Sequence, residues 1–220
     1  MRMKVFVFSF VLAFVASAAD AQTGAPTGTL AQRIGHFDRT KARHVVGPHG
    51  GAGAMEIVRL LDPSSLSTVF QFLDVGIVNP RSGLGQHFHH NSEEMFISLE
   101  GPDAEFTING RTSALKTPGG APARLGSSHA FYNPSDQPML WLDFGIGNWS
   151  KTHDSFNLGD DRVGAALDKI PQFVNFHMDP RLLKPVVNMN GGAGTVMYRR
   201  LLGPTVFLSL IHISEPTRPY

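Results

Sequence analysis

Cysteine is absent from all 220 residues of the chain. The protein therefore has no disulfide bond and no thiolate chemistry, so its stability has to come from a hydrophobic core. Charged residues are also scarce, at 17% against 42% hydrophobic residues, which is typical of a globular protein and not of a disordered one. The sequence has no nucleophile elbow or triad-like arrangement. Its glycine-rich segment 50–53 lacks the lysine and the strand–helix context of a phosphate-binding loop.

The first 21 residues have the pattern of a secretory signal peptide. Arg2 and Lys4 precede an apolar run over residues 5–16, and residues 19–21 (Ala-Asp-Ala) form a small-x-small cleavage site. The apolar run is shorter than the roughly 20 residues that a membrane-spanning helix needs. We expect residues 1–21 to be removed and the mature protein to be periplasmic or secreted.

The mature chain is close to neutral. Cleavage after residue 21 lowers the count of basic residues from 19 to 17 and that of acidic residues from 18 to 17. Binding to nucleic acid or to an anionic membrane requires a basic surface, so we expect neither as a partner. A small-molecule substrate or ligand is the expected partner.

Residues 44–149 have the pattern of an antiparallel β-barrel or sandwich, after a lead-in over residues 22–43 that we expect to be flexible. Short apolar runs alternate with turn residues, and Asn109-Gly110 suits a type I′ hairpin turn. The apolar runs cover residues 55–61, 67–78, 94–99, 105–108, 129–132 and 139–146. We expect Phe96, Phe106, Phe131 and Phe144 in the barrel core.

The chain beyond the barrel is expected to contain a connector, over residues 150–185, with one helix at residues 160–170 that ends at Pro171. A repeat follows, because residues 50–63 align without gaps to residues 191–204, with eight of fourteen positions identical at an offset of 141. Self-similarity of this kind predicts that a second barrel begins over residues 186–207. Residues 208–220 resemble translated sequencing-library adapter, and we expect them not to belong to the natural protein.

Four residues within the barrel predict a metal site. His87 and His89 are two positions apart, so on a strand both imidazoles point to the same face. Glu94 opens the next apolar strand and would lie across from them, and His129 offers a fourth ligand downstream. Imidazoles and a carboxylate that converge from neighbouring strands form the coordination shell of a divalent transition metal ion. His90 has the wrong strand parity and is expected to face outward.

These motifs carry a resemblance to a known family. His87-x-His89-x4-Glu94-x6-Gly101 resembles the first motif of the cupin superfamily, and Gly126-x2-His129-x3-Asn133 resembles the second. The resemblance implies an all-β fold, the double-stranded β-helix (jelly-roll) barrel, within a chain that has two such barrels. It also implies His87, His89, Glu94 and His129 as metal ligands and an assembly of identical subunits.

The metal and the reaction are left open by the residues. Iron, manganese, zinc, nickel and copper all suit mixed imidazole and carboxylate ligands. The resemblance implies a metalloenzyme that acts on a small oxygen-rich or carboxylate substrate, with dioxygenase-type chemistry favoured over an oxalate-type decarboxylase or oxidase. The alternatives are a non-catalytic barrel that binds a sugar or an aromatic acid, and a storage or assembly protein.

Four further residues are candidates for substrate binding, each with a structural alternative. Arg124 could pair with an anionic substrate or lie on the surface, and Asn133 could orient a ligand or initiate a turn before Pro134. Trp141 and Asp143 alternate along one strand and so share a face, which is either the barrel mouth or part of the core.

Overall fold

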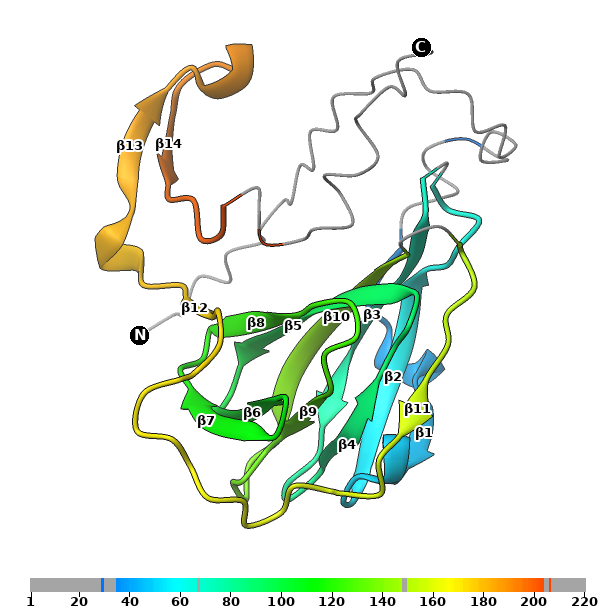
Figure 1. Cartoon of the computed structure of the whole chain (residues 1–220). Helices are drawn as coiled ribbons and strands as arrows, with labels where there is room; N and C mark the ends of the chain where they lie inside the picture. Colours follow the sequence, from blue (N-terminus) through cyan, green and yellow to red (C-terminus); the bar gives the residue numbers. More distant parts are fainter. Residues whose placement is uncertain (1–28, 30–34, 67, 148–149, 204–205, 207–220) are drawn as a thin grey trace, which may run out of the picture.

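The computed structural model describes residue 29 and residues 35–66, 68–147, 150–203 and 206 (Figure 1). The signal peptide expected at residues 1–21 and the non-native tail expected at residues 208–220 lie outside this part of the chain. Within the described residues, no helix has both the length and the apolar character needed to cross a membrane.

Two antiparallel sheets face each other and form the barrel (Figure 1). The larger sheet contains, in spatial order, β1 (Arg43–Val46), β2 (Ala54–Leu61), β3 (Phe70–Val78), β10 (Met139–Gly147), β5 (Ser92–Glu100), β8 (Gly119–Ala123) and β12 (Phe176–His177). The smaller sheet contains β11 (Phe156–Asn157), β4 (Gly83–Phe88), β9 (His129–Tyr132), β6 (Ala104–Ile108) and β7 (Arg111–Leu115). The predicted jelly-roll barrel is confirmed.

Strand β5 is buried on both faces, because the barrel core covers one face and a second apolar cluster covers the other. Phe96 points into the barrel and belongs to the main core with Phe106, Phe131 and Trp141. Met95 and Ile97, on the opposite face, pack with residues that follow the barrel. Phe144 packs against this outer cluster, so its expected place in the barrel core is wrong. It directly follows Asp143 on β10, and alternation along the strand gives the two side chains opposite faces.

Three turns depend on left-handed backbone conformations. The hairpin from β6 to β7 turns at Asn109 (φ 50°) and Gly110 (φ 76°), which confirms the predicted type I′ pattern. Gly101 and Gly126, the glycines of the two motifs, have φ values of 113° and 72°. A side chain at either position would be strained, which explains why glycine stands there.

The connector wraps around the barrel as extended chain. It adds β11 to the smaller sheet and β12 to the larger one (Figure 1). Regular structure other than strands is limited, in the described residues, to the short 3-10 turns η2 (Arg39–Lys41), η3 (Pro48–Gly50), η4 (Pro180–Leu182) and η5 (Met189–Gly191).

The helix expected over residues 160–170 is wrong. Arg162 has a φ of 62°, which a right-handed helix does not allow, and its backbone N–H is taken by the carboxylate of Asp160. Asp168 accepts two hydrogen bonds from the guanidinium of Arg111 on β7, at 2.8 and 2.6 Å. Local Asx turns and contacts with the barrel therefore override the helical propensity of this segment.

A separate hairpin of β13 (Lys184–Val187) and β14 (Thr195–Tyr198) repeats the geometry of the hairpin β1–β2. The cross-strand register is the same at the offset of 141, as the pairs Arg43↔Ile57 and Lys184↔Tyr198 show. The loops also match, with φ values of 53° at His49 and 54° at Asn190. The β1–β2 hairpin continues into the larger sheet, whereas β13 and β14 form a sheet of two strands in the described residues. The second barrel itself stays a prediction.

Candidate metal centre

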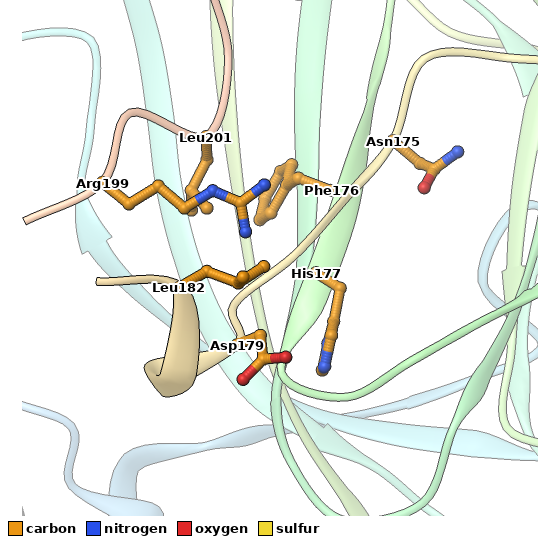
Figure 2. A pocket seen from close by; sticks show the side chains of 7 residues that line it. All are labelled: Asn175, Phe176, His177, Asp179, Leu182, Arg199 and Leu201. Carbon is orange, nitrogen blue, oxygen red and sulfur yellow. The ribbon is translucent and has the colours of Figure 1, made fainter. Parts of the chain in front are cut away.

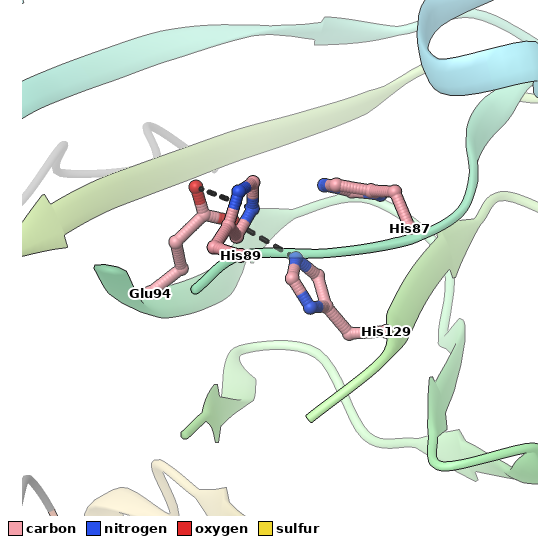
Figure 3. A group of neighbouring side chains, drawn as sticks. All are labelled: His87, His89, Glu94 and His129. Atoms are coloured by element: carbon pink, nitrogen blue, oxygen red, sulfur yellow. Dashed lines mark hydrogen bonds and ion pairs between the residues drawn. The ribbon is translucent and has the colours of Figure 1, made fainter. Parts of the chain in front are cut away.

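The barrel brings the four predicted ligand residues together. His87 on β4 pairs directly with His129 on β9, His89 follows β4, and Glu94 reaches across from β5 (Figure 3). One ligand atom from each residue lies within 4.8 Å of the others. All four residues are 1–2% exposed, so the group is shielded from bulk water. We call His87, His89, Glu94 and His129 the ligand group.

The three imidazoles are oriented in the same way. In each, Nδ1 contacts a backbone carbonyl oxygen, which leaves Nε2 to point toward the centre of the group. The carbonyls belong to Gly85 for His87, Asp154 for His89 and Ser127 for His129. An anchored Nδ1–H fixes the tautomer of a histidine and prepares its Nε2 lone pair for a metal ion.

Glu94 sets the electrostatics of the group. Its carboxylate lies 3.0 Å from Nε2 of His129 and 3.3 Å from Nε2 of His89. Burial favours the neutral carboxyl, but the two histidines outweigh burial and hold the pKa of Glu94 well below its usual range. Glu94 therefore supplies a buried negative charge.

The pKa values of His87 and His89 are shifted in opposite directions. Burial, reinforced by the charges of His129 and His49, lowers the pKa of His87 to about 2, so this imidazole is neutral. Burial also opposes charge on His89, but the adjacent Glu94 carboxylate prevails and raises the pKa of His89.

The ligand group fits a divalent transition metal ion. Nε2 of His89 is buried and makes no hydrogen bond within the described residues, although it lies among three other ligand atoms. A buried polar atom without a partner is costly, and a metal ion would satisfy it. Three imidazoles and one carboxylate suit iron, manganese, zinc, nickel or copper.

His90 and Glu93, which neighbour the ligands in sequence, do not point toward the ligand group. His90 points outward, with 60% of its side chain exposed, as its strand parity predicts. Glu93 is buried but accepts a hydrogen bond from the backbone N–H of Leu125, on the other side of β5 from Glu94.

His49 lies at the site, although neither sequence motif includes it. Its ring stacks on that of His87, with centroids 3.7 Å apart and planes 5° apart. The glycine-rich segment positions it, because a Cβ on Gly51 would lie 2.2 Å from the carbonyl oxygen of Gly83. Only a glycine at position 51 lets these two backbones approach so closely.

His153, from the segment after β10, is a second histidine that the motifs did not indicate. Its Nε2 lies 3.6 Å from Oε1 of Glu94, and its ring centroid is 4.3 Å from that of His89. Burial lowers the pKa of His153 to about 4. Both extra histidines come from segments outside the two motifs.

Two of the four substrate-binding candidates face the barrel interior. Trp141 belongs to the core, and Asp143, two positions along β10, is 4% exposed on the same face. Burial and the charges of Glu94 and Asp74 raise the pKa of Asp143 well above its usual range. Its Oδ1 has no hydrogen-bond partner in the described residues. Asp143 is therefore a buried carboxyl whose surroundings favour its protonated form.

An ion pair lies next to Asp143. Asp74, its cross-strand neighbour on β3, accepts two hydrogen bonds from the guanidinium of Arg59, at 2.5 and 2.9 Å. Arg59 is 42% exposed and lies over the ring of Phe72, which in turn meets His153 edge-on. Arg59 is thus a cation at the edge of the interior that sequence patterns did not single out.

Arg124 and Asn133 are not brought to the ligand group. Nε of Arg124 donates to the carbonyl oxygen of Val206. Asn133 lies beyond the end of β9 opposite to His129, where its amide donates to three carbonyl oxygens and accepts from Ser135. These bonds use the full capacity of the amide, so Asn133 stabilises a turn.

A pocket of about 280 Å³ lies outside the barrel, between the connector and the segment after β14 (Figure 2). Its lining consists of Asn175, Phe176, His177, Asp179, Leu182, Arg199 and Leu201. It shares no residue with the ligand group. Asp179, its acidic residue, is already paired with the guanidinium of Arg181. Chemistry is therefore better supported at the ligand group than at this pocket.

The comparisons with known proteins concern the fold. No protein-family model and no curated protein matches the chain. A predicted oxalate decarboxylase from Thermotoga maritima matches with a TM-score of 0.47 and 20% identity, over 50% of this chain and 96% of the other. A cupin-superfamily sugar phosphate isomerase from Silicibacter pomeroyi matches with a TM-score of 0.43 and 18% identity, over 56% and 80%. A cupin 2 conserved barrel domain protein from Salinispora arenicola matches with a TM-score of 0.42 and 22% identity, over 51% of this chain and 87% of the other. Each name describes that other protein.

Proposed function

We propose that this chain, a cupin by its barrel and its two motifs, is an exported metalloenzyme that acts on a small oxygen-rich or carboxylate molecule by dioxygenase-type chemistry. The observation that carries the proposal is the ligand group, three anchored imidazoles and one carboxylate converging at a buried point. Export is supported by the signal-peptide pattern of residues 1–21.

A metal ion at this point would supply Lewis-acid polarisation or one-electron chemistry, with up to two coordination positions left for substrate or dioxygen. The chain supplies the surroundings. Phe96 packs 5.2 Å from the ring of His129 and Phe72 packs against His153, so both rings limit the access of water. Arg59 at the edge of the interior would attract an anionic substrate.

Decarboxylation is the second candidate, and Asp143 favours it. Loss of carbon dioxide from a carboxylate leaves an electron pair on carbon, which has to receive a proton. Asp143 is a buried carboxyl whose pKa is raised well above its usual range, which favours its protonated form as a proton donor. It could give that proton to the carbon and become a carboxylate that water reprotonates.

The test is to load the metal-free protein with iron(II) or manganese(II) without oxygen and then offer dihydroxylated aromatic acids and oxalate. Oxygen uptake and carbon dioxide release are measured together, for the wild type and for a His87→Ala/His89→Ala variant. Substrate-dependent oxygen uptake that is lost in the variant supports a dioxygenase. Carbon dioxide release without oxygen uptake supports the decarboxylase, and ligand binding without turnover supports a binding barrel.

Export is tested separately. We expect the mature protein in the periplasmic fraction or the medium, with its N-terminus at Gln22 by mass spectrometry of the intact chain. An uncleaved protein retained in the cytoplasm would contradict this part of the proposal.

A further inference from the structure

The segment after β10 lies against the entrance to the ligand group. We call residues 150–157 the strap. The side-chain amide of Gln71 donates to the carbonyl oxygens of Ser150 and Thr152, both at 3.1 Å. Asn91 donates to the same carbonyl of Thr152 at 2.6 Å. The strap is therefore held from strand β3 and from the turn between β4 and β5.

Lys151, a residue of the strap, makes further contacts with the loop between β2 and β3. Its ammonium group donates to the carbonyl oxygens of Pro63 and Leu66, both at 2.8 Å. The strap also accepts from the ligand group itself, because Nδ1 of His89 contacts the carbonyl of Asp154. The position of every residue in the middle of the strap is thus defined by contacts with the barrel.

His153 sits in the middle of the strap, and its tautomer follows from its neighbours. Its Nδ1 lies 3.2 Å from Oε1 of Gln71 and 3.2 Å from the hydroxyl of Ser92. The amide nitrogen of Gln71 is already used as a donor to the strap, so its Oε1 is an acceptor. Nδ1 of His153 therefore carries the hydrogen, and Nε2 carries a lone pair.

That lone pair is directed at another acceptor. Nε2 of His153 lies 3.6 Å from Oε1 of Glu94, a carboxylate oxygen. Two acceptors at this distance stabilise the fold only when a cation or a hydrogen-bond donor lies near both. His153 has an anchored Nδ1 and an inward Nε2, as do the three imidazoles of the ligand group. With 30% of its side chain exposed, it forms the boundary between the group and solvent.

We propose that His153 is a fifth protein ligand of the metal ion, supplied by the strap and absent from both sequence motifs. The inference rests on the proposed metal site and deepens it. Five protein ligands leave one position on a six-coordinate ion, so the substrate would bind through one atom and not as a chelate. The strap would then couple metal binding to the closure of the barrel entrance.

The experiment compares wild type, His153→Ala, His153→Gln and a matched control, His90→Ala. His90 is 60% exposed, and its Nδ1 lies 3.5 Å from the carboxylate of Asp154 in the strap, so its loss removes an imidazole and a strap contact without removing a member of the ligand group. Affinity for zinc and for cobalt(II) is measured by competition with a chromophoric chelator. The visible absorption of the cobalt(II) protein reports the coordination number without any turnover.

We expect both His153 variants to bind metal about 10–100-fold more weakly than wild type. Their cobalt(II) spectrum should change, and added imidazole should restore it in His153→Ala, while His90→Ala stays like wild type. Wild-type affinity and an unchanged spectrum in both variants would overturn the fifth ligand and leave the four-residue site intact. Absence of metal from the wild type would instead overturn the proposed function, and with it this inference.

Discussion

Glu94→Gln tests the electrostatics of the ligand group, because Glu94 is its one anionic member. The substitution keeps the shape of the side chain but leaves a divalent ion surrounded by neutral ligands. A unit charge pair 4 Å apart is worth about 4 kcal/mol at an effective dielectric of 20. We take a loss of about 2.7 kcal/mol, a factor of about 100 in affinity, as a cautious estimate.

Thermal unfolding converts this loss into a measurable shift. At a metal concentration about 100 times the dissociation constant, the wild type gains about 2.7 kcal/mol of stability, whereas a variant that binds about 100-fold more weakly gains about 0.4 kcal/mol. For a chain of this size, each kcal/mol moves the unfolding midpoint by about 2–4 °C. We therefore expect a metal-induced rise of about 5–11 °C in the wild type and about 1–2 °C in Glu94→Gln.

The matched control is Glu93→Gln, on the other side of the same strand. Its amide oxygen can still accept from the backbone N–H of Leu125, so the fold and the metal-induced shift should be kept. Equal metal-induced shifts in Glu94→Gln and in the wild type would refute the role given to Glu94.

Three further predictions concern residues around the ligand group. Folding raises the pKa of Asp143, so the folded chain keeps this proton to higher pH than the unfolded chain does. Between the pKa of the unfolded state and that of the folded state, the free energy of unfolding therefore falls by about 1.4 kcal/mol per pH unit. Urea unfolding of the metal-free protein should show that Asp143→Asn becomes more stable relative to the wild type as the pH rises from 4 to 7. A difference in the free energy of unfolding that does not grow with pH would contradict this prediction. Gly51→Ala places a Cβ 2.2 Å from the carbonyl of Gly83 and should cost about 1–3 kcal/mol in the same assay; unchanged stability would show that the loop moves freely. Asn133→Ala leaves buried carbonyls unpaired and should destabilise the fold by about 2–3 kcal/mol with metal affinity unchanged, whereas lost ligand binding in a stable variant would restore its predicted substrate role.

Features that depend on residues a few positions apart could be predicted best from the sequence. Alternating apolar residues between turn residues predict the strands, and Asn109-Gly110 predicts a hairpin turn that the backbone confirms. The spacing of His87 and His89 also determines which face they share. Here each inference depends on neighbours a few residues apart.

The sequence was least informative where a residue acts through a distant contact. His49 reaches the site because Gly51 packs against the backbone of β4, and His153 reaches it because Gln71 holds the strap. No regular spacing of residues in the sequence indicates either contact. The glycine-rich segment before β2 was a signal that a close backbone approach occurs nearby, although it could not show which histidine would benefit.

The error over residues 160–170 has the same origin. The composition of this segment favours a helix, but Asp160 caps the N–H of Arg162 and Asp168 pairs with Arg111 on the barrel. Propensity is a weak preference of a few tenths of a kcal/mol per residue, and tertiary contacts of this kind exceed it.

Metal content is the most direct test of the central claim that the ligand group holds a metal ion. The protein is purified from the periplasm without added metal, and elemental analysis is run beside the His87→Ala/His89→Ala variant, with circular dichroism to verify folding. The account predicts about one iron, manganese, zinc, nickel or copper ion per chain in the wild type and a near-complete loss in the variant. Two folded proteins that both lack metal would contradict it.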